Sequence, residues 1–526
     1  MTLEGLSIIG QNRVNRAGKP VPAINPATGS ELPASFHWAT NEDVARAAEL
    51  ASKAFAEYRR WPAARRAKLL RAIADLIEKN ASALVERANL ETALPGARLQ
   101  GEIARTCGQL RLFASLIEEG WWLDARIDHA NPERKPVPKP DVRSLLQPLG
   151  PVAVFSSSNF PFAFSVAGGD TASALAAGCP VIVKPHQGHL GTSEAVGVLV
   201  QQAARESGAP EGVFSLLFGP GREVGMALVK HPLIKAVGFT GSRAGGRALM
   251  DAAAARPEPI PVYAEMGSIN PVFILPGAMK QSAEALATGL HGSVTLGVGQ
   301  FCTNPGLVFI DPETLTQPFL QKLGALMAAT PAGTMLTPSI CSEYHGGIEK
   351  FSKTAGVRVL TPTDTSKRNG EARATLFATA ADVFLKNHEL MNEVFGPSTL
   401  VVHCSSKEHM LAAAEKLEGQ LTATIHGTPD DFAANADLLA ILETKVGRLV
   451  CNGYPTGVEV CHAMNHGGPY PATADGRSTS VGTRAIVRFA RPVCYQNFPE
   501  SALPDELKES NPLGLWRLVD GQLGKH

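Results

Sequence analysis

The feature that most constrains the fold is a series of short β-branched segments that begins at Pro151. The segments are PVAVF, PVIVK, VFSLLF, KAVGF and PVFIL, and each is followed by a Gly- or Ser-containing turn. They alternate with small-residue helical stretches, which is typical of a doubly wound parallel sheet. Ligands of such sheets lie beyond the carboxyl ends of the strands. The sequence therefore predicts an α/β fold with functional residues in these turns.

The chain before Pro151 is predicted to be mainly helical. Thr40 and Asp43 match a capping box, and the residues after them place apolar side chains on one helical face. A second helix is predicted after Trp61-Pro62 and a third over residues 97–119.

The segment 122–150 breaks the helical pattern. Two extended pieces, around DARIDHA and DVRSLLQPL, flank the proline-rich PERKPVPKP. Proline can neither continue a helix nor donate to a sheet, so we interpret this segment as a projecting arm or hairpin. Near the C-terminus, TRAIVRFARPVCYQN is predicted to be an exposed strand that pairs with another element or another subunit.

Charge and cysteine content argue against several classes of protein. The 49 Lys and Arg residues are balanced by 49 Asp and Glu residues, whereas a general nucleic-acid binder needs clustered basic charge. The eight scattered cysteines contain no CxxC pair, which favours reduced thiols and a cytoplasmic location. No run of about eighteen apolar residues predicts a membrane span, and the start of the chain lacks the pattern of a secretory signal.

Two acidic or nucleophilic residues can carry chemistry. Cys302, in GVGQFCTNPG, lies among small residues, and a thiol nucleophile must be partly exposed. The alternative is a buried structural cysteine. Glu265 ends the strand-like PVYAE and can accept a proton from water, or it can be an ordinary surface glutamate.

Two polar turns follow other predicted strands. Asn159, in SSSNFPF, can donate its amide to an oxyanion or can simply be a turn residue. The stretch FTGSRAGG, residues 239–246, joins a strand to a helix start and can bind a diphosphate at the helix N-terminus. A glycine turn that serves only backbone geometry explains this stretch equally well.

In this order, the motifs SNFPF, VIVKP, PEGVFSLLFG, FTGSRAGG, EMGS, GQFC and EVFGP resemble those of the aldehyde dehydrogenase superfamily. The resemblance implies a Rossmann-type cofactor-binding domain (1–121 and 148–262) and an α/β catalytic domain (263–460). It also implies a small β oligomerisation arm (122–147 and 480–500). Because an exposed edge strand is normally covered by a partner, we expect a homodimer or a homotetramer.

The resemblance implies oxidation of a small-molecule aldehyde to an acid through a thioester. Cys302 is the implied nucleophile, and Glu265 the implied general base for hydrolysis. The Asn159 side chain and the Cys302 backbone N–H are the implied oxyanion donors. The implied cofactor contacts are Lys184 at the adenosine ribose, Gly241, Ser242 and Gly246 at the pyrophosphate turn, Glu393 at the nicotinamide ribose and Phe395 beside that half of the cofactor.

Two departures from the family pattern concern cofactor and pocket. NAD-preferring relatives often carry a glutamate three residues after the lysine, whereas this chain has Gln187 there, with His186 beside it. Loss of that carboxylate removes repulsion of a 2′-phosphate, so we expect NADP to be preferred, with NAD also possible. Ser157 and Ser158 replace the Pro-Trp found before the asparagine in many relatives. A metal site at His186 and His189 is not expected, because no carboxylate or thiolate lies at ligand spacing.

Within the superfamily, ARLQGEIARTCGQLRLFA and HGGPYPATADGRSTSVGT resemble the α-ketoglutarate semialdehyde (2,5-dioxovalerate) dehydrogenases. That substrate carries a carboxylate, for which Arg105 is the candidate partner, although Arg105 can instead pair with Glu102. Phe160 and Phe164 are candidate pocket walls or simply core residues. The alternatives are a broad-range or long-chain NADP-linked enzyme, a coenzyme A-acylating dehydrogenase, or a catalytically silent binding protein.

Overall fold

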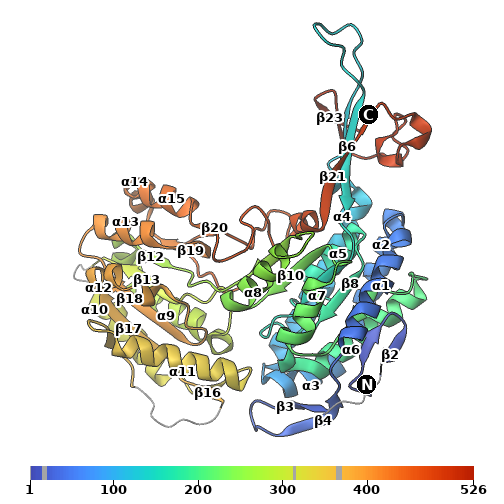
Figure 1. Cartoon of the computed structure of the whole chain (residues 1–526). Helices are drawn as coiled ribbons and strands as arrows, with labels where there is room; N and C mark the ends of the chain where they lie inside the picture. The colour runs from blue at the N-terminus through green and yellow to red at the C-terminus, as the bar shows by residue number, and fades with distance from the viewer. Residues whose placement is uncertain (1, 15–19, 312–315, 363–369, 526) are drawn as a thin grey trace.

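The structure, a computed structural model, describes residues 2–14, 20–311, 316–362 and 370–525. Two lobes lie side by side, and a narrow arm projects from one of them (Figure 1). Each lobe is built on a seven-stranded sheet with helices packed against it, which confirms the predicted α/β class. None of the helices in the described ranges has the length and apolar character of a membrane span.

The first sheet has the strand order β11-β10-β7-β8-β9-β1-β2. Its central strands run parallel, with Phe155 beside Lys184 and Thr240 beside Glu265. All four residues end their strands, so their side chains emerge at one edge, as the sequence predicts. The strands are β1 (Ser7–Ile9), β2 (Asn12–Val14), β7 (Val152–Phe155), β8 (Val181–Lys184), β9 (Phe214–Leu216), β10 (Ala236–Thr240) and β11 (Val262–Glu265).

The helices of this lobe cover both faces of the first sheet. The capping box of Thr40 and Asp43 begins the first helix, as predicted, and the two other predicted helices are also present. The sequence analysis missed α3, which follows α2 after a single residue. The helices of this lobe are α1 (Asn41–Tyr58), α2 (Ala63–Lys79), α3 (Ala81–Thr92), α4 (Gly96–Glu119), α5 (Gly169–Ala177), α6 (Leu190–Glu206), α7 (Met226–Lys230) and α8 (Arg243–Ala254).

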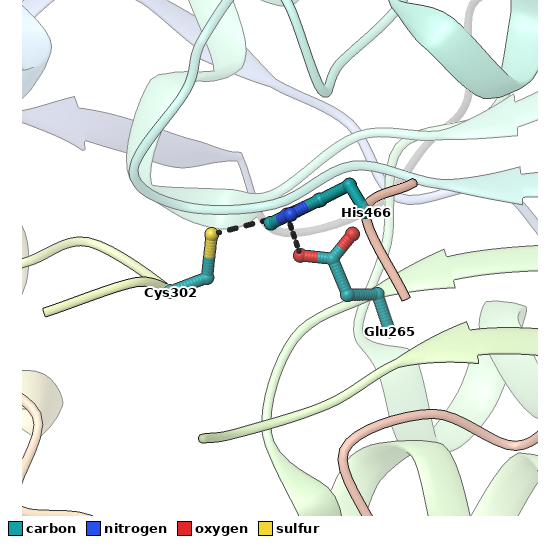
Figure 2. Close-up of side chains that lie close together, drawn as sticks. All are labelled: Glu265, Cys302 and His466. Carbon is teal, nitrogen blue, oxygen red and sulfur yellow. Dashed lines mark hydrogen bonds and ion pairs between the residues drawn. The ribbon is translucent and has the colours of Figure 1, made fainter. Parts of the chain in front are cut away.

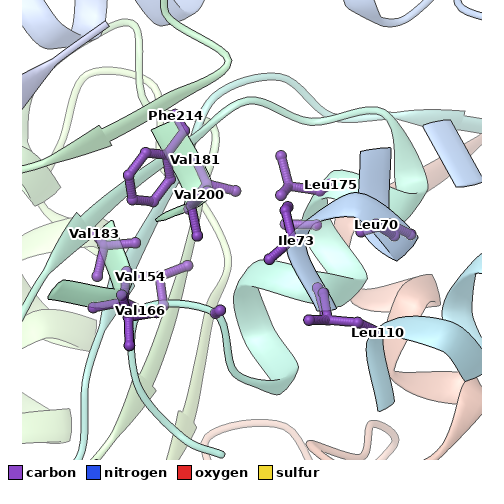
Figure 3. Close-up of a cluster of buried hydrophobic side chains, with 14 of the residues drawn as sticks. Leu70, Ile73, Leu110, Val154, Val166, Leu175, Val181, Val183, Val200 and Phe214 are labelled. Atoms are coloured by element: carbon purple, nitrogen blue, oxygen red, sulfur yellow. The ribbon is translucent and has the colours of Figure 1, made fainter. Parts of the chain in front are cut away.

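The main core lies between the sheet and the helices α2, α4, α5 and α6 (Figure 3). Ile73 of α2, Leu110 of α4 and Leu175 of α5 are each at most 1% exposed, as are Val181 and Val183 of β8. Burial of this apolar surface is the main favourable term for the lobe and fixes where the strand ends lie.

The second sheet has the order β15-β17-β18-β13-β12-β19-β20 and is parallel except for β15. Its strands are β12 (Val272–Ile274), β13 (Leu307–Ile310), β15 (Arg358–Val359), β17 (Thr375–Ala380), β18 (Ser398–His403), β19 (Gln420–His426) and β20 (Val446–Cys451). The helices of this lobe are α9 (Pro276–Thr295), α10 (Thr316–Ala329), α11 (Pro338–Lys353), α12 (Ala381–Lys386), α13 (Lys407–Lys416), α14 (Pro429–Ala434) and α15 (Ala436–Glu443). Two-stranded ribbons are formed by β3 (Val21–Ile24) with β4 (Glu31–Phe36), and by β14 (Gly333–Thr334) with β16 (Glu371–Ala372).

The arm is a five-stranded sheet of order β21-β6-β5-β22-β23. The extended pieces predicted within 122–150 are β5 (Arg126–Asp128) and β6 (Val142–Pro148). The last two strands, β22 (Arg517–Val519) and β23 (Gln522–Gly524), come from the C-terminus and were missed.

The strand predicted over TRAIVRFARPVCYQN is only half correct. Ala490–Gln496 forms β21, but Thr483–Phe489 is a 3₁₀ helix, η6. The reason is burial, because Ile486 and Phe489 are fully buried in the core of the first lobe. The domain boundaries predicted from the sequence remain a prediction.

A buried ion pair fixes η6 to the first lobe. The Arg488 guanidinium lies 2.6 Å from the Asp170 carboxylate, and the two side chains are 4% and 9% exposed. Asp170 begins α5 and packs beneath Gly238 of β10. Because η6 leads directly into β21, the pair also determines where the arm leaves the lobe.

We expect Asp170→Asn to destabilise the folded chain by about 3–5 kcal/mol, because it leaves Arg488 buried without a counter-charge. Urea unfolding measured by tryptophan fluorescence tests this. The matched control is Asp251→Asn, which breaks the exposed Asp251–Arg247 pair and should cost about 0.3–0.5 kcal/mol. Equal unfolding midpoints for the two variants would contradict the structural role of the buried pair.

Candidate active site

The candidate catalytic cysteine lies in a backbone segment of unusual shape. Gly297, Val298 and Gly299 all have positive φ, between 57° and 65°. A β-branched residue is strained there, so surrounding contacts must impose the conformation. Gly299 supplies one reason, since a Cβ on it would lie 2.3 Å from the backbone of Gly396. The loop that carries Cys302 is therefore shaped by close packing on the EVFGP segment.

Asn270 holds this loop from the other side. Its amide nitrogen donates to the carbonyls of Cys302 (2.9 Å) and Asn304 (3.0 Å). Its amide oxygen accepts from the hydroxyls of Ser268 and Thr422, both at 3.0 Å. Asn270 is fully buried and has φ of 48°, a region that asparagine tolerates better than most residues. The sequence analysis did not single out this residue.

Asn159 is also brought to the cysteine loop. It follows β7, and its side-chain amide donates to the Gln300 carbonyl at 3.0 Å. Its own carbonyl accepts from Arg98 Nη2 at 2.7 Å. An asparagine amide has two N–H bonds, so one can hold Gln300 while the other serves an oxyanion.

Cys302 and Glu265 lie together with His466, a residue that the sequence analysis did not assign. His466 Nε2 is 3.5 Å from Cys302 Sγ and 2.9 Å from Glu265 Oε1 (Figure 2). The His466 and Glu265 side chains are 0% and 3% exposed, whereas Cys302 is partly exposed. The two predicted catalytic residues thus share a third, histidine partner.

The loop that contains His466 also holds the second oxygen of Glu265. The Ser480 hydroxyl donates to Glu265 Oε2, and the Thr479 hydroxyl accepts from the His466 backbone N–H at 2.8 Å. These residues belong to HGGPYPATADGRSTSVGT, which the sequence analysis used only as a resemblance. No local pattern identifies them, because His466 and Ser480 are 201 and 215 positions away from Glu265.

The two acids of the site have pKa values shifted in opposite directions. Burial alone raises the pKa of Glu265, but the charge of His466 and hydrogen bonds from His466, Ser480 and Cys302 outweigh it, so this pKa is lowered. Burial raises the pKa of the Cys302 thiol well above its usual value, and the negative charge of Glu265 raises it further. In this arrangement Glu265 is an anion and the thiol is protonated.

Aromatic and basic side chains lie beside the catalytic candidates. Phe160 lies 5.3 Å from Phe164 and 5.4 Å from Phe301 between ring centres. The Arg105 guanidinium lies 5.8 Å and 5.4 Å from the rings of Phe160 and Phe164. Phe160 is buried and Phe164 half-buried, and the Phe164 ring is 6.2 Å from that of His466.

Arg105 interacts electrostatically with Cys302. Burial lowers its pKa, and the groups that oppose this shift are Cys302, Glu102 and Glu265. Its Nε atom is buried and has no hydrogen-bond partner in the described chain. The Glu102 carboxylate accepts instead from the backbone N–H groups of Phe162 and Ala163, at 2.8 and 3.0 Å. The arginine is therefore available to an anionic ligand beside Cys302.

The predicted cofactor contacts at the adenosine end include a buried lysine. Lys184 ends β8 and is 8% exposed, and burial lowers its pKa to about 8. Gln187 is exposed and His186 half-buried, with the His186 Nδ1 atom accepting from the Gly188 N–H. His189 is a core residue, because its ring is fixed between the Ser157 carbonyl (2.7 Å) and the Ser193 hydroxyl (3.0 Å). Because burial is the cause of its lowered pKa, Lys184 fits the phosphate- or ribose-binding role.

The FTGSRAGG turn has the expected strand-turn-helix form. Ser242 caps α8 by accepting from the Gly245 N–H at 3.2 Å, and the remaining N–H groups of the first helical turn suit a diphosphate. A Cβ on Gly241 would lie 2.6 Å from the Phe239 ring, and one on Gly246 would lie 2.6 Å from Met266 Sδ. Both glycines therefore serve close packing, and their contact with a cofactor stays a prediction.

Glu393 and Phe395 come from the second lobe. The Glu393 carboxylate lies over the backbone of Gly267, where a Cβ would be only 2.1 Å from Oε2. Glu393 is exposed and Phe395 half-buried. EVFGP and EMGS are therefore side by side, although Gly267 and Glu393 are 126 positions apart in the sequence. Together with Lys184 and the turn at Ser242, these residues fit a dinucleotide.

The sequence pattern of the family described as "Aldehyde dehydrogenase family" matches residues 14–480. The chain belongs to the aldehyde dehydrogenase family. It is 53% identical over 524 residues to "Alpha-ketoglutaric semialdehyde dehydrogenase 2" of Azospirillum brasilense, which covers 99% of this chain and 100% of that protein. It is 44% identical over 520 residues to "Alpha-ketoglutaric semialdehyde dehydrogenase" of Acinetobacter baylyi, which covers 99% and 98% of the two chains.

Solved structures support the fold. Lactaldehyde dehydrogenase from Escherichia coli matches with a TM-score of 0.81 and 21% identity, over 94% of this chain and 99% of that one. NADP-dependent glyceraldehyde-3-phosphate dehydrogenase from Bacillus halodurans, complexed with NADP, matches with a TM-score of 0.80 and 23% identity over the same shares.

We expect Glu265→Gln to shift the alkylation of Cys302 by iodoacetamide to lower pH. The reason is the sign of the coupling, since a neighbouring anion raises the pKa of the Cys302 thiol and its removal lowers that pKa. Mass spectrometry of the peptide that contains Cys302, sampled over time from pH 6 to about pH 10, gives the profile for each protein. Alkylation of exposed Cys494 in the same samples is the control and should not change. A wild-type-like profile for Cys302 would show that Glu265 does not influence the sulfur.

Proposed function

We propose that this protein oxidises 2,5-dioxovalerate (α-ketoglutarate semialdehyde) to 2-oxoglutarate, with NADP as the preferred acceptor. The observation that carries the proposal is the convergence of Cys302, Glu265 and Arg105 on one half-buried site. The names of the relatives at 53% and 44% identity support the choice of substrate.

The proposed first step is addition of Cys302 Sγ to the aldehyde carbon. The thiol proton passes to the Glu265–His466 pair as the carbon–sulfur bond forms, and a thiohemiacetal results. The Asn159 amide and the Cys302 backbone N–H donate to the developing oxyanion. Arg105 stabilises the thiolate that must form, because its positive charge opposes the rise in the thiol pKa.

The dinucleotide, held by Lys184, Ser242, Glu393 and Phe395, supplies the hydride acceptor of the reaction. After the Glu265–His466 pair has released the thiol proton to solvent, Glu265 takes a proton from water, whose oxygen attacks the thioester carbonyl and releases the acid and the Cys302 thiolate. The lowered pKa of Glu265 keeps it deprotonated for this role. His466 and Ser480 hold one carboxylate oxygen each, and so orient Glu265 beside the sulfur.

Arg105 is the proposed partner of the substrate's far carboxylate. A guanidinium binds a carboxylate through two parallel hydrogen bonds, and Arg105 has an unpartnered Nε at the Phe160–Phe164 wall. A straight-chain apolar aldehyde has no carboxylate for the Arg105 guanidinium to bind. The carboxylate-reading role therefore distinguishes the proposal from a broad-range or long-chain enzyme.

We expect Arg105→Met to lower the ratio of kcat/KM for 2,5-dioxovalerate to kcat/KM for hexanal by about 30- to 100-fold, because a charge-assisted hydrogen-bonded pair is worth about 1.5–3 kcal/mol. Loss of thiolate stabilisation affects both aldehydes alike and leaves this ratio unchanged. Reduction of NADP at 340 nm measures both values of kcat/KM. Arg111→Met, on the exposed part of the same helix, is the control. A parallel fall for both aldehydes would remove Arg105 from carboxylate recognition. Coenzyme A thioester in the product mixture would favour the acylating alternative.

The proposed preference for NADP rests on Gln187. A carboxylate at this position would repel a 2′-phosphate, whereas the neutral amide does not. We further propose a homo-oligomer that uses the arm, in a cytoplasmic setting. The eight cysteines are all free, including exposed Cys451 and Cys494, which suits a reducing compartment.

We expect Gln187→Glu to move the ratio of kcat/KM for NADP over NAD towards NAD by about tenfold or more, which corresponds to about 1.4 kcal/mol of added repulsion. Initial rates with each dinucleotide at saturating aldehyde give the ratio. Gln187→Ala serves as the control, because it removes the amide without adding charge. An unchanged ratio in Gln187→Glu would mean that position 187 does not face the 2′-position.

A further inference from the structure

We propose that Cys302, Glu265 and His466 form a binding site for one Zn²⁺ ion, and that occupancy of this site reversibly inhibits the enzyme. The sulfur, the imidazole nitrogen and a carboxylate oxygen all lie within 4.8 Å of one another. They come from three separate segments and point towards one another (Figure 2). The sequence analysis expected no metal site because it considered only His186 and His189.

The distances from His466 Nε2 to the other two ligand atoms are close to those of a tetrahedral zinc site. Bond lengths of about 2.3 Å to sulfur and about 2.0–2.1 Å to nitrogen place those two atoms about 3.5 Å apart around zinc. Cys302 Sγ and His466 Nε2 are 3.5 Å apart. The nitrogen and the Glu265 oxygen are 2.9 Å apart, so they need to separate by about 0.4 Å to replace their hydrogen bond with metal bonds.

The chemistry of the ligands selects the metal. A thiolate and an imidazole favour zinc and its neighbours in the first transition row, whereas Mg²⁺ and Ca²⁺ prefer oxygen ligands only. The thiolate and the carboxylate together neutralise the double charge of the ion, which a buried site requires. Ser480 holds the carboxylate oxygen that is not needed for the metal, and so supports the orientation of the ligand.

Binding of Zn²⁺ would block the proposed roles of Cys302 as nucleophile and of Glu265 as base at the same time. The Cys302 thiol loses its proton to solvent as the sulfur–zinc bond forms, and the Glu265 oxygen that borders the sulfur becomes a ligand. No electrons are transferred, so a chelator restores the free thiol and carboxylate. Three protein ligands leave a fourth position open towards the partly exposed side of Cys302, where water or the aldehyde can enter.

Cobalt is the direct probe of the site, because four-coordinate Co²⁺ with a thiolate ligand absorbs strongly in the visible and shows a sulfur-to-metal band in the near ultraviolet. We expect the purified full-length chain, without aldehyde or dinucleotide, to bind one equivalent of Co²⁺ with both bands. Zn²⁺ should displace the cobalt, EDTA should abolish the spectrum, and Mg²⁺ should give no signal. Zn²⁺ should also inhibit aldehyde oxidation, and EDTA should reverse it.

The variants separate this site from other metal-binding groups. We expect His466→Phe and, as a smaller change, His466→Gln to lose the spectrum and to raise the half-inhibitory Zn²⁺ concentration of any remaining activity at least about tenfold, since even groups that only support a ligand contribute about 10–100-fold. His462→Phe is the matched control in the same loop, and its exposed ring should leave the spectrum unchanged. Circular dichroism verifies that each variant is folded.

Three results would overturn the proposal. They are wild-type protein without the sulfur-to-cobalt band, a Cys302→Ala variant that retains the band, and folded His466 variants that bind cobalt like the wild type. The cobalt-binding measurement does not depend on the proposed function, because it uses no substrate. If the protein failed to oxidise 2,5-dioxovalerate but still bound cobalt through Cys302, the metal site would stand and only its inhibitory consequence for that reaction would fall.

Discussion

The position of the sulfur of Cys302, the proposed nucleophile, depends on the hydrogen bonds of one buried amide. Asn270 lies just before β12, yet its side chain binds the carbonyls of Cys302 and Asn304 and receives a bond from Thr422 of β19. A loop with three consecutive residues at positive φ would not keep this shape alone. By tying the loop to two adjacent strands, Asn270 places Cys302 relative to the second sheet. Glu265, by contrast, belongs to the first sheet, so the site exists only where the two lobes meet.

The contact between the two lobes places the negative charge of Glu265 beside the Cys302 thiol. A carboxylate beside a thiol stabilises the protonated thiol, which is the form that cannot attack an aldehyde. His466 and Arg105 are the neighbouring groups that act against this effect. His466 binds the carboxylate directly, while Arg105 favours the thiolate. The proposed base can thus remain ionised for hydrolysis without fully suppressing the proposed nucleophile.

The sequence predicted well those features that depend on neighbouring residues. The strands after Pro151, the capping box at Thr40 and the position of Glu265 at a strand end all follow from local pattern. The features that it missed depend on distant contacts. His466 is polar and lies in a loop, so nothing local distinguishes it from a surface histidine. The segment 483–489 has a strand-like composition, but the core of the first lobe covers it and a 3₁₀ helix results. Similarly, β22 and β23 form only because β5 offers an edge to pair with.

Cofactor selection shows how structure changes the meaning of a sequence pattern. The sequence places His186 and His189 near Lys184, where a protonated ring would attract a 2′-phosphate. In the structure His189 is bound within the core, and burial together with the charges of His189 and Lys184 lowers the pKa of His186, so neither ring supplies a positive charge at neutral pH. Lys184 is then the one cation of this predicted contact group, and it serves NAD and NADP alike. The proposed preference for NADP therefore rests on the missing carboxylate at position 187, and a preference built on reduced repulsion is a matter of degree and not of exclusion.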